Sequence, residues 1–100
     1  MEGELLFRLL TPQKEVASVR CESVNLIEKE DLQGLGGGSI GVRRGHIPAV
    51  IALAEDGAIK VISGGKAVFR AAVHGGFARV DAASVTVLTP AAEIFMDAGN

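Results

Sequence analysis

The sequence predicts an all-β fold, an antiparallel β-sandwich of about 8–10 short strands. Turn residues recur about every 8–12 positions, which is typical of sandwiches and barrels. The segments between them alternate apolar with polar residues, as half-buried strands do. No stretch before Pro90 has the periodicity of a helix.

Composition indicates one domain with an aliphatic core. The chain has 100 residues, of which 48% are hydrophobic, and its four aromatic residues are all phenylalanine. A chain of this length buries only about 60–65% of its unfolded surface. We therefore expect modest stability, or stability shared with partners.

Charge and cysteine content exclude several classes of protein. The net charge is −2 and there is no basic excess, which argues against nucleic-acid binding. The single cysteine, Cys21, cannot form an internal disulfide and fits a reducing compartment. Glu2 and Glu4 stand where a signal peptide would be basic, and no run approaches the roughly 18 apolar residues of a membrane span. We expect no direct membrane insertion, so any membrane role would be peripheral.

The first third of the chain predicts three strands. Glu4–Leu10 is nearly all apolar, which favours a strand buried on both faces, and Pro12 marks the turn after it. Glu15–Cys21 and Glu22–Ile27 both alternate. The parity of their apolar positions changes around Glu22–Ser23, which predicts a bulge or a bend.

The middle of the chain combines an irregular stretch with further strands. Residues 28–38 are charged and then glycine-rich, and we expect them to be the least regular part. Short strands are predicted at Ile40–Val42, Val50–Leu53, Ala58–Ile62 and Lys66–Val73.

Val73–Thr89 contains two alternating runs around a short polar link and predicts a strand hairpin. We assign structural roles to three residues at its start. Gly75 and Gly76 permit positive φ or close backbone approach, and Phe77 is expected to fill the core.

Pro90–Met96 favours a helix. Thr89 suits the N-cap, Pro90 suits the first helical position, and Glu93 falls within the first turn. The chain ends at Asn100, so this helix would have at most two turns, and an isolated helix of that length is marginal. We predict a sandwich domain over residues 1–90 and a short tail over residues 91–100 that could begin a helix.

No segment predicts catalysis, a metal site or a bound cofactor. Cys21 lies on an apolar alternating strand and is expected to be a small buried hydrophobe. His46 and His74 are too few and too far apart for a zinc site. The glycine-rich segments at Gly36–Ser39 and Gly64–Lys66 lack the helix and the lysine–hydroxyl pair of a phosphate loop.

The sharpest polar cluster is Arg43-Arg44-Gly45-His46. It fits either a solvated hairpin tip or a recognition loop, in which two guanidinium groups would pair with carboxylates of a partner.

Two motifs give the chain a family resemblance. Ser39–Pro48, SIGVRRGHIP, resembles the Gly-Ile-x-Pro-Gly-His-x-Pro segment of the epsilon subunit of rotary F-type ATP synthases. Val73–Leu88 resembles that family's Val-Ser-Gly-Gly-Phe…Val…Val-Thr-Val-Leu strand pair, and Ala92-Glu93 resembles the pair that closes its domain. The resemblance covers Leu5–Glu93.

This resemblance implies a non-catalytic antiparallel sandwich at the foot of the central stalk, peripheral to the cytoplasmic face of the bacterial inner membrane. Its implied partners are the gamma subunit and the membrane c-ring, and the coupling ion, proton or sodium, stays open. The contact candidates are Ser39, Ile40, Gly41, Val42, Arg43, Arg44, Gly45 and His46.

The sequence departs from the family pattern in three ways. Arg44 stands where proline is usual, and Gly36–Ile40 lacks the usual carboxylates, so the loop charge is basic rather than acidic. The C-terminal helical hairpin is absent from this sequence. The alternative function is a stand-alone ligand-binding β-sandwich. A stalk subunit should expose a continuous apolar patch on one sheet, whereas a ligand module should show a pocket with convergent polar groups.

Overall fold

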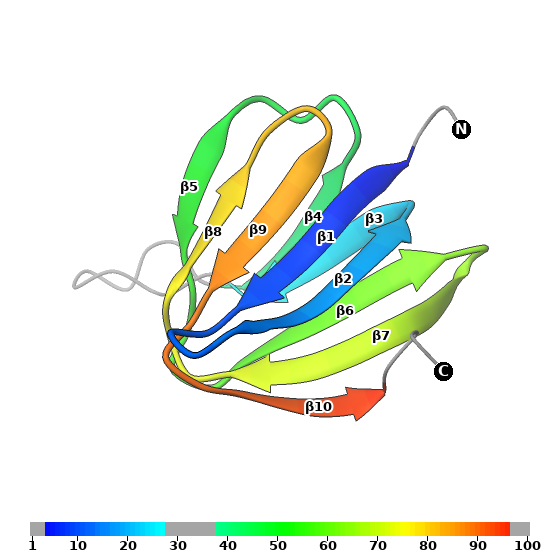
Figure 1. Cartoon of the computed structure of the whole chain (residues 1–100). Coiled ribbons are helices and arrows are strands. Elements are labelled where there is room, and N and C mark those ends of the chain that lie inside the picture. Colours follow the sequence, from blue (N-terminus) through cyan, green and yellow to red (C-terminus); the bar gives the residue numbers. More distant parts are fainter. Residues whose placement is uncertain (1–3, 28–37, 97–100) are drawn as a thin grey trace.

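The computed structural model describes residues 4–27 and 38–96, and within them every regular element is a strand (Figure 1). No helix that could span a membrane occurs in this part of the chain. The strands are β1 (Leu5–Leu10), β2 (Glu15–Cys21), β3 (Ser23–Ile27), β4 (Ser39–Arg43), β5 (Ala49–Ala52), β6 (Gly57–Ser63), β7 (Lys66–Val73), β8 (Phe77–Val80), β9 (Ser84–Leu88) and β10 (Ala92–Met96).

These strands form two stacked five-stranded sheets, so the predicted β-sandwich is confirmed. We call the sheet with strand order β2-β1-β9-β8-β5 sheet A and the sheet with order β10-β7-β6-β3-β4 sheet B. All neighbours pair antiparallel except β1 and β9, which are parallel. Residues 28–37 of the predicted irregular segment lie outside the described residues.

The core is the layer between the two sheets. Strand alternation points aliphatic side chains of both sheets into it, and Phe7 of sheet A meets Phe69 of sheet B with ring centroids 5.5 Å apart. Sheet A contributes Leu5, Phe7, Leu9, Cys21, Ile51, Ala78, Val80, Val85 and Val87, and sheet B contributes Val24, Leu26, Val42, Ile59, Val61, Phe69, Ala71 and Val73.

The prediction that Glu4–Leu10 is buried on both faces is wrong. Leu5, Phe7 and Leu9 are fully buried, but the residues between them are only half-buried and face out of sheet A. The outer face of a sandwich sheet is open to solvent or partners, so an apolar run here does not mean burial on both sides.

The predicted bend at Glu22–Ser23 is confirmed, because the chain passes there from β2 in sheet A to β3 in sheet B. The Glu22 amide donates to Ile62 O at 2.8 Å, which ties the bend to sheet B. The change in parity thus reflects a change of sheet.

The predicted helix at Pro90–Met96 is wrong, because Ala92–Met96 is strand β10. It pairs with β7, and the His74 amide donates to Ala91 O at 3.1 Å where the pairing begins. Each residue of a short strand gains a partner on an existing sheet edge. A helix of two turns lacks such neighbours, so tertiary pairing overrides the local capping signal.

Truncating one buried and one exposed phenylalanine should distinguish a core position from a surface position by the loss of stability. Phe69→Ala removes a fully buried ring and should cost about 3–5 kcal/mol of unfolding free energy. Phe77→Ala removes a ring that is 55% exposed and should cost far less. Urea unfolding of both variants measures the difference, and equal losses would contradict this assignment of the core.

Candidate functional site

The segment between β4 and β5 forms a braced loop at one end of the sandwich. Gly45 has φ 89°, and its amide donates to Ala82 O in the β8–β9 turn at 2.7 Å. The His46 amide donates to Arg43 O at 3.2 Å, which closes the turn. A glycine is needed at residue 45 because a side chain would strain this backbone conformation.

The two arginines of this loop are exposed. Arg44 Nη1 donates to Glu4 O at 3.3 Å, whereas Arg43 has no ion-pair or side-chain hydrogen-bond partner among the described residues. His46 Nδ1 lies 2.8 Å from Ile47 O, a carbonyl oxygen that accepts a hydrogen bond in the tautomer with the proton on Nδ1. The loop therefore offers guanidinium donors to a partner at the end of the molecule where β1 begins.

The neighbouring β8–β9 turn is held by one carboxylate. Asp81 Oδ1 accepts from the amides of Ala83 and Ser84 at 2.8 Å each, and Oδ2 accepts from Ser84 Oγ at 3.0 Å. Hydrogen bonds from the Ala83 amide and the Ser84 hydroxyl lower the pKa of Asp81 below its ordinary value. The turn that supports Gly45 thus depends on an ionised carboxylate.

The structure brings only some of the predicted contact candidates to the surface. Ser39, Gly41, Arg43, Arg44 and Gly45 are exposed, and Ile40 and His46 are half-buried. Val42 is fully buried, and its side chain belongs to the core.

Phe77 does not fill the core, which corrects its predicted role. Ala78 and Val80 of β8 face inward, and Phe77 therefore faces outward with 55% of its surface exposed. The alternation already contained this signal, since Phe77 and Val80 are three residues apart and must lie on opposite faces of a strand.

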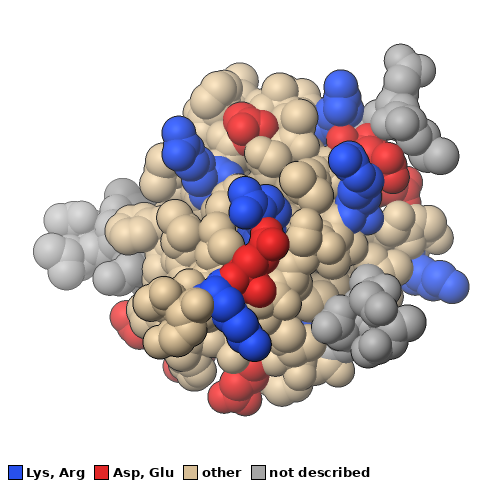
Figure 2. Space-filling view, viewed as in Figure 1, with Lys and Arg blue, Asp and Glu red and all other residues tan. Residues whose placement is uncertain are grey.

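The outward position of Phe77 completes an apolar row that the sequence analysis missed. Strand register aligns Ala52 of β5 with Phe77, Phe77 with Leu88 of β9, and Leu88 with Leu10 of β1. Val50, which is 69% exposed, adjoins this row on β5. We call these five residues the sheet A apolar row. Acidic and basic side chains are interspersed over the face of the molecule seen in Figure 2, with uncharged surface between them.

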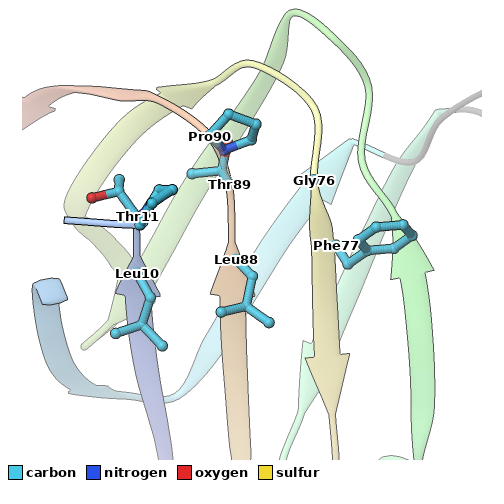
Figure 3. Close-up of a pocket in the computed structure, with 8 residues that line it drawn as sticks. Leu10, Thr11, Gly76, Phe77, Leu88, Thr89 and Pro90 are labelled. Carbon is cyan, nitrogen blue, oxygen red and sulfur yellow. The ribbon is translucent and has the colours of Figure 1, made fainter. Parts of the chain in front are cut away.

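A shallow pocket of about 390 Å³ lies at the end of the sheet A apolar row. Side chains from three neighbouring strands and from the turns beyond them surround it (Figure 3). Its lining residues are Leu10, Thr11, Pro12, Gly76, Phe77, Leu88, Thr89 and Pro90. Its lining is mostly apolar, and it lies at the opposite end of β1 from the Arg44 contact.

Gly76 shapes this pocket through close backbone contact. Its φ is 102°, and a Cβ placed on it would lie 2.1 Å from Leu88 O. Gly75 also has positive φ, at 77°. These angles confirm that the Gly75-Gly76 pair permits positive φ, and the Leu88 contact confirms close approach at Gly76.

The remaining reactive groups do not assemble into a site. Cys21 is fully buried, and burial, reinforced by the charges of Glu4 and Glu22, raises the pKa of its thiol to about 11. His74 Nε2 lies 3.7 Å from Glu93 Oε1 at the surface. Across residues 4–27 and 38–96, no group of three or more His, Cys, Asp or Glu side chains could hold a metal ion.

Comparison with known proteins decides the family. Residues 4–95 match the model of the ATP synthase delta/epsilon chain beta-sandwich domain. The chain belongs to this family. The family's fold and the resemblance of the two sequence motifs are thereby confirmed.

Relatives agree with this assignment. The chain is 40% identical over 60 residues to the ATP synthase epsilon chains of Rhodococcus opacus and Rhodococcus jostii, covering 60% of this chain and 49% of each relative. It therefore spans about half the length of these curated relatives.

Solved structures share the fold. A chain in the Euglena gracilis mitochondrial ATP synthase OSCP/F1/c-ring structure superposes with a TM-score of 0.76 at 23% identity, covering 94% of this chain and 55% of that one. A chain in the Tetrahymena thermophila central stalk/c-ring structure gives 0.63 at 14% identity, covering 89% and 65%.

Gly76→Ala should destabilise the domain more than Gly64→Ala. Both glycines have positive φ, but a Cβ at residue 64 meets nothing within 4 Å, so that variant bears only backbone strain of about 1–2 kcal/mol. At residue 76 the Leu88 backbone must also move. Thermal unfolding of both variants tests this, and a smaller loss at residue 76 would refute the close contact.

Asp81→Ala should lower the melting temperature at neutral pH, and the loss should shrink in strong acid. The folded-state pKa of Asp81 is depressed, so its stabilisation is present above the unfolded-state pKa and disappears as pH falls through the folded-state pKa. Asp56→Ala, an exposed turn carboxylate, is the control. A pH-independent difference between wild type and Asp81→Ala would contradict the role of the ionised carboxylate.

Proposed function

We propose that this chain is the β-sandwich domain of a non-catalytic epsilon subunit in the central stalk of an F-type ATP synthase. In this role it couples the gamma subunit to the membrane c-ring and lies peripherally at the cytoplasmic face of the membrane. Support comes from the family match, the two sequence motifs and the fold shared with chains in solved ATP synthase assemblies.

The observation that supports this function best is the sheet A apolar row. It exposes Phe77, Leu88 and Val50 on one sheet face. In a domain that functions alone, polar side chains would be more favourable at these solvent-exposed positions. A partner protein covering this face would remove that surface from water. The pocket beside the row lacks the convergent polar groups expected of a ligand-binding module.

A coupling subunit needs two separate surfaces, and β1 connects two such surfaces. The Glu4 carbonyl, just before β1, accepts a hydrogen bond from Arg44, whereas Leu10 at its far end lines the apolar pocket. Six residues of strand separate them, a span of roughly 20 Å. We assign the apolar row to the gamma subunit and the Arg43–His46 loop to acidic side chains of the stalk or ring.

A direct test is binding of the chain to the gamma subunit of the same source. We expect the purified chain to bind the gamma subunit without other subunits. We also expect the chain by itself not to hydrolyse ATP. Failure to bind gamma under conditions where other stalk contacts form would refute the proposal.

Replacing Arg43 and Arg44 together by Ala should weaken assembly modestly and reduce its salt dependence. Exposed ion pairs contribute only about 0–1 kcal/mol each and are screened by salt. Lys60→Ala with Arg70→Ala is the matched control, because it removes the same charge from the outer face of sheet B. Binding is measured at low and high salt. Identical salt dependence in both double variants would show that the loop is merely solvated.

A further inference from the structure

The carboxylate of Asp81 sets the direction of two peptide planes in the β8–β9 turn. Its Oδ1 accepts the amides of Ala83 and Ser84 at 2.8 Å each. The peptides of this turn are trans, and in a trans peptide the carbonyl of one residue points away from the amide of the next. Because both amides point at the carboxylate, the carbonyls of Ala82 and Ala83 must point away from it.

These two carbonyls join the turn to its neighbours in space. Ala82 O accepts the amide of Gly45 in the β4–β5 loop at 2.7 Å, and Ala83 O accepts the amide of Leu6 in β1 at 3.0 Å. If either peptide turned over, its N–H would face the N–H of Gly45 or Leu6, and the bond would be lost. The link between the turn, the loop and β1 therefore depends on the peptide orientation that Asp81 sets.

The Arg43–His46 loop needs this link, because its other contacts constrain it less. The His46 amide donates to Arg43 O, which closes the turn without joining it to another strand. Arg44 Nη1 reaches Glu4 O at 3.3 Å, but through a long and exposed side chain. The bond from Gly45 to the β8–β9 turn ties the loop backbone directly to a different segment.

The charge of Asp81 strengthens its hold on the turn. Hydrogen bonds from the Ala83 amide and the Ser84 hydroxyl keep the pKa of this carboxyl below its ordinary value, so it is ionised at neutral pH. Ionised acceptors make stronger hydrogen bonds than neutral ones. The turn is therefore held firmly although it lies at the surface.

We propose that Asp81 is a positioning residue for the Arg43–His46 loop, acting through the Ala82–Ala83 peptide. This inference rests on the proposed function, since it takes the loop as the surface that meets acidic side chains of the stalk or ring. It adds a residue, distant in sequence, that determines how the two guanidinium groups are presented.

Amide hydrogen exchange of the purified chain, followed by NMR, tests whether Asp81 holds the loop. The Gly45 amide reports on the loop, and the Leu53 amide, which donates to Gly76 O at the other end of the sandwich, is the internal reference. Asp81→Ala should accelerate exchange of Gly45 relative to Leu53 by about tenfold or more. Asp56→Ala, in the exposed β5–β6 turn, removes the same charge and should leave the ratio unchanged. A uniform loss of stability would accelerate both amides together, so the ratio isolates the loop.

Asp81→Asn is the conservative variant. Its side-chain oxygen can still accept from the amides of Ala83 and Ser84, but it has no full charge. Protection of Gly45 relative to Leu53 should therefore decrease in the order wild type, Asp81→Asn, Asp81→Ala. A wild-type ratio in Asp81→Ala would overturn the positioning role, and if only Asp81→Asn folds, a wild-type ratio in that variant would overturn it.

Binding to a stalk–ring complex that lacks this chain connects the loop position to assembly. By charge alone, removing a carboxylate near a basic loop should strengthen the attraction of the loop to acidic side chains. The positioning role predicts the opposite sign. Asp81→Ala should bind about threefold or more weakly than wild type, and with less dependence on salt. Asp56→Ala should bind as wild type does.

The outcomes separate this inference from the proposed function. If wild type binds the complex and Asp81→Ala binds it equally well or more tightly, the positioning role is refuted and the proposed function stands. If wild type does not bind, the proposed function is refuted, and the exchange ratio of Gly45 still decides whether Asp81 holds the loop.

Discussion

The hydrophobic core between the two sheets determines which way every strand residue faces, and the composition of the exposed surface follows from that constraint. In β8, Ala78 and Val80 complete the core, so Phe77 and Arg79 must point outward. A slip of one residue would bury Arg79 and expose Val80, at a large cost in free energy. The apolar row thus exists because the core takes the alternate residues.

The segments in which the chain crosses from one sheet to the other are a second constraint on the structure. At the β7–β8 crossing, the Gly75 amide donates to Ala54 O, while the Gly76 carbonyl accepts from Leu53 in the β5–β6 crossing. These two crossings brace each other, and Gly76 in turn contacts the end of β9. The pocket beside Gly76 is therefore a product of how the crossings pack.

Local patterns could predict the strands, but not the way in which they pair. Alternation and turn residues predicted a sandwich, and the parity change at Glu22–Ser23 predicted a bulge or a bend, but only the structure shows that the chain changes sheet there. The capping residues of Pro90–Met96 gave the wrong element, because an open edge of β7 lies beside that segment in space. The residues of this segment alone do not indicate that such an edge lies beside them.

The candidate site likewise has one part that the local sequence could predict and one part that depends on strand pairing. Arg43 and Arg44 are adjacent in sequence, so a local motif could predict an exposed basic loop. Leu10, Phe77 and Leu88 become neighbours only through the parallel β1–β9 pairing and the antiparallel β8–β9 pairing. No periodicity within one segment contains that register, and the position of the row could be found only from the fold.

The same pairing bears on how the domain could transmit force. β1 has a hydrogen-bonded neighbour on each side, β2 and β9, and its inward residues pack against sheet B. The proposed contacts with the gamma subunit and with the ring lie at its two ends. A displacement applied at one end can reach the other only by moving the strand with its neighbours, because sliding β1 alone would break ladders on both sides and open a close-packed core. The domain should therefore behave as a rigid coupling between its partners, with any compliance in the loops that contact them.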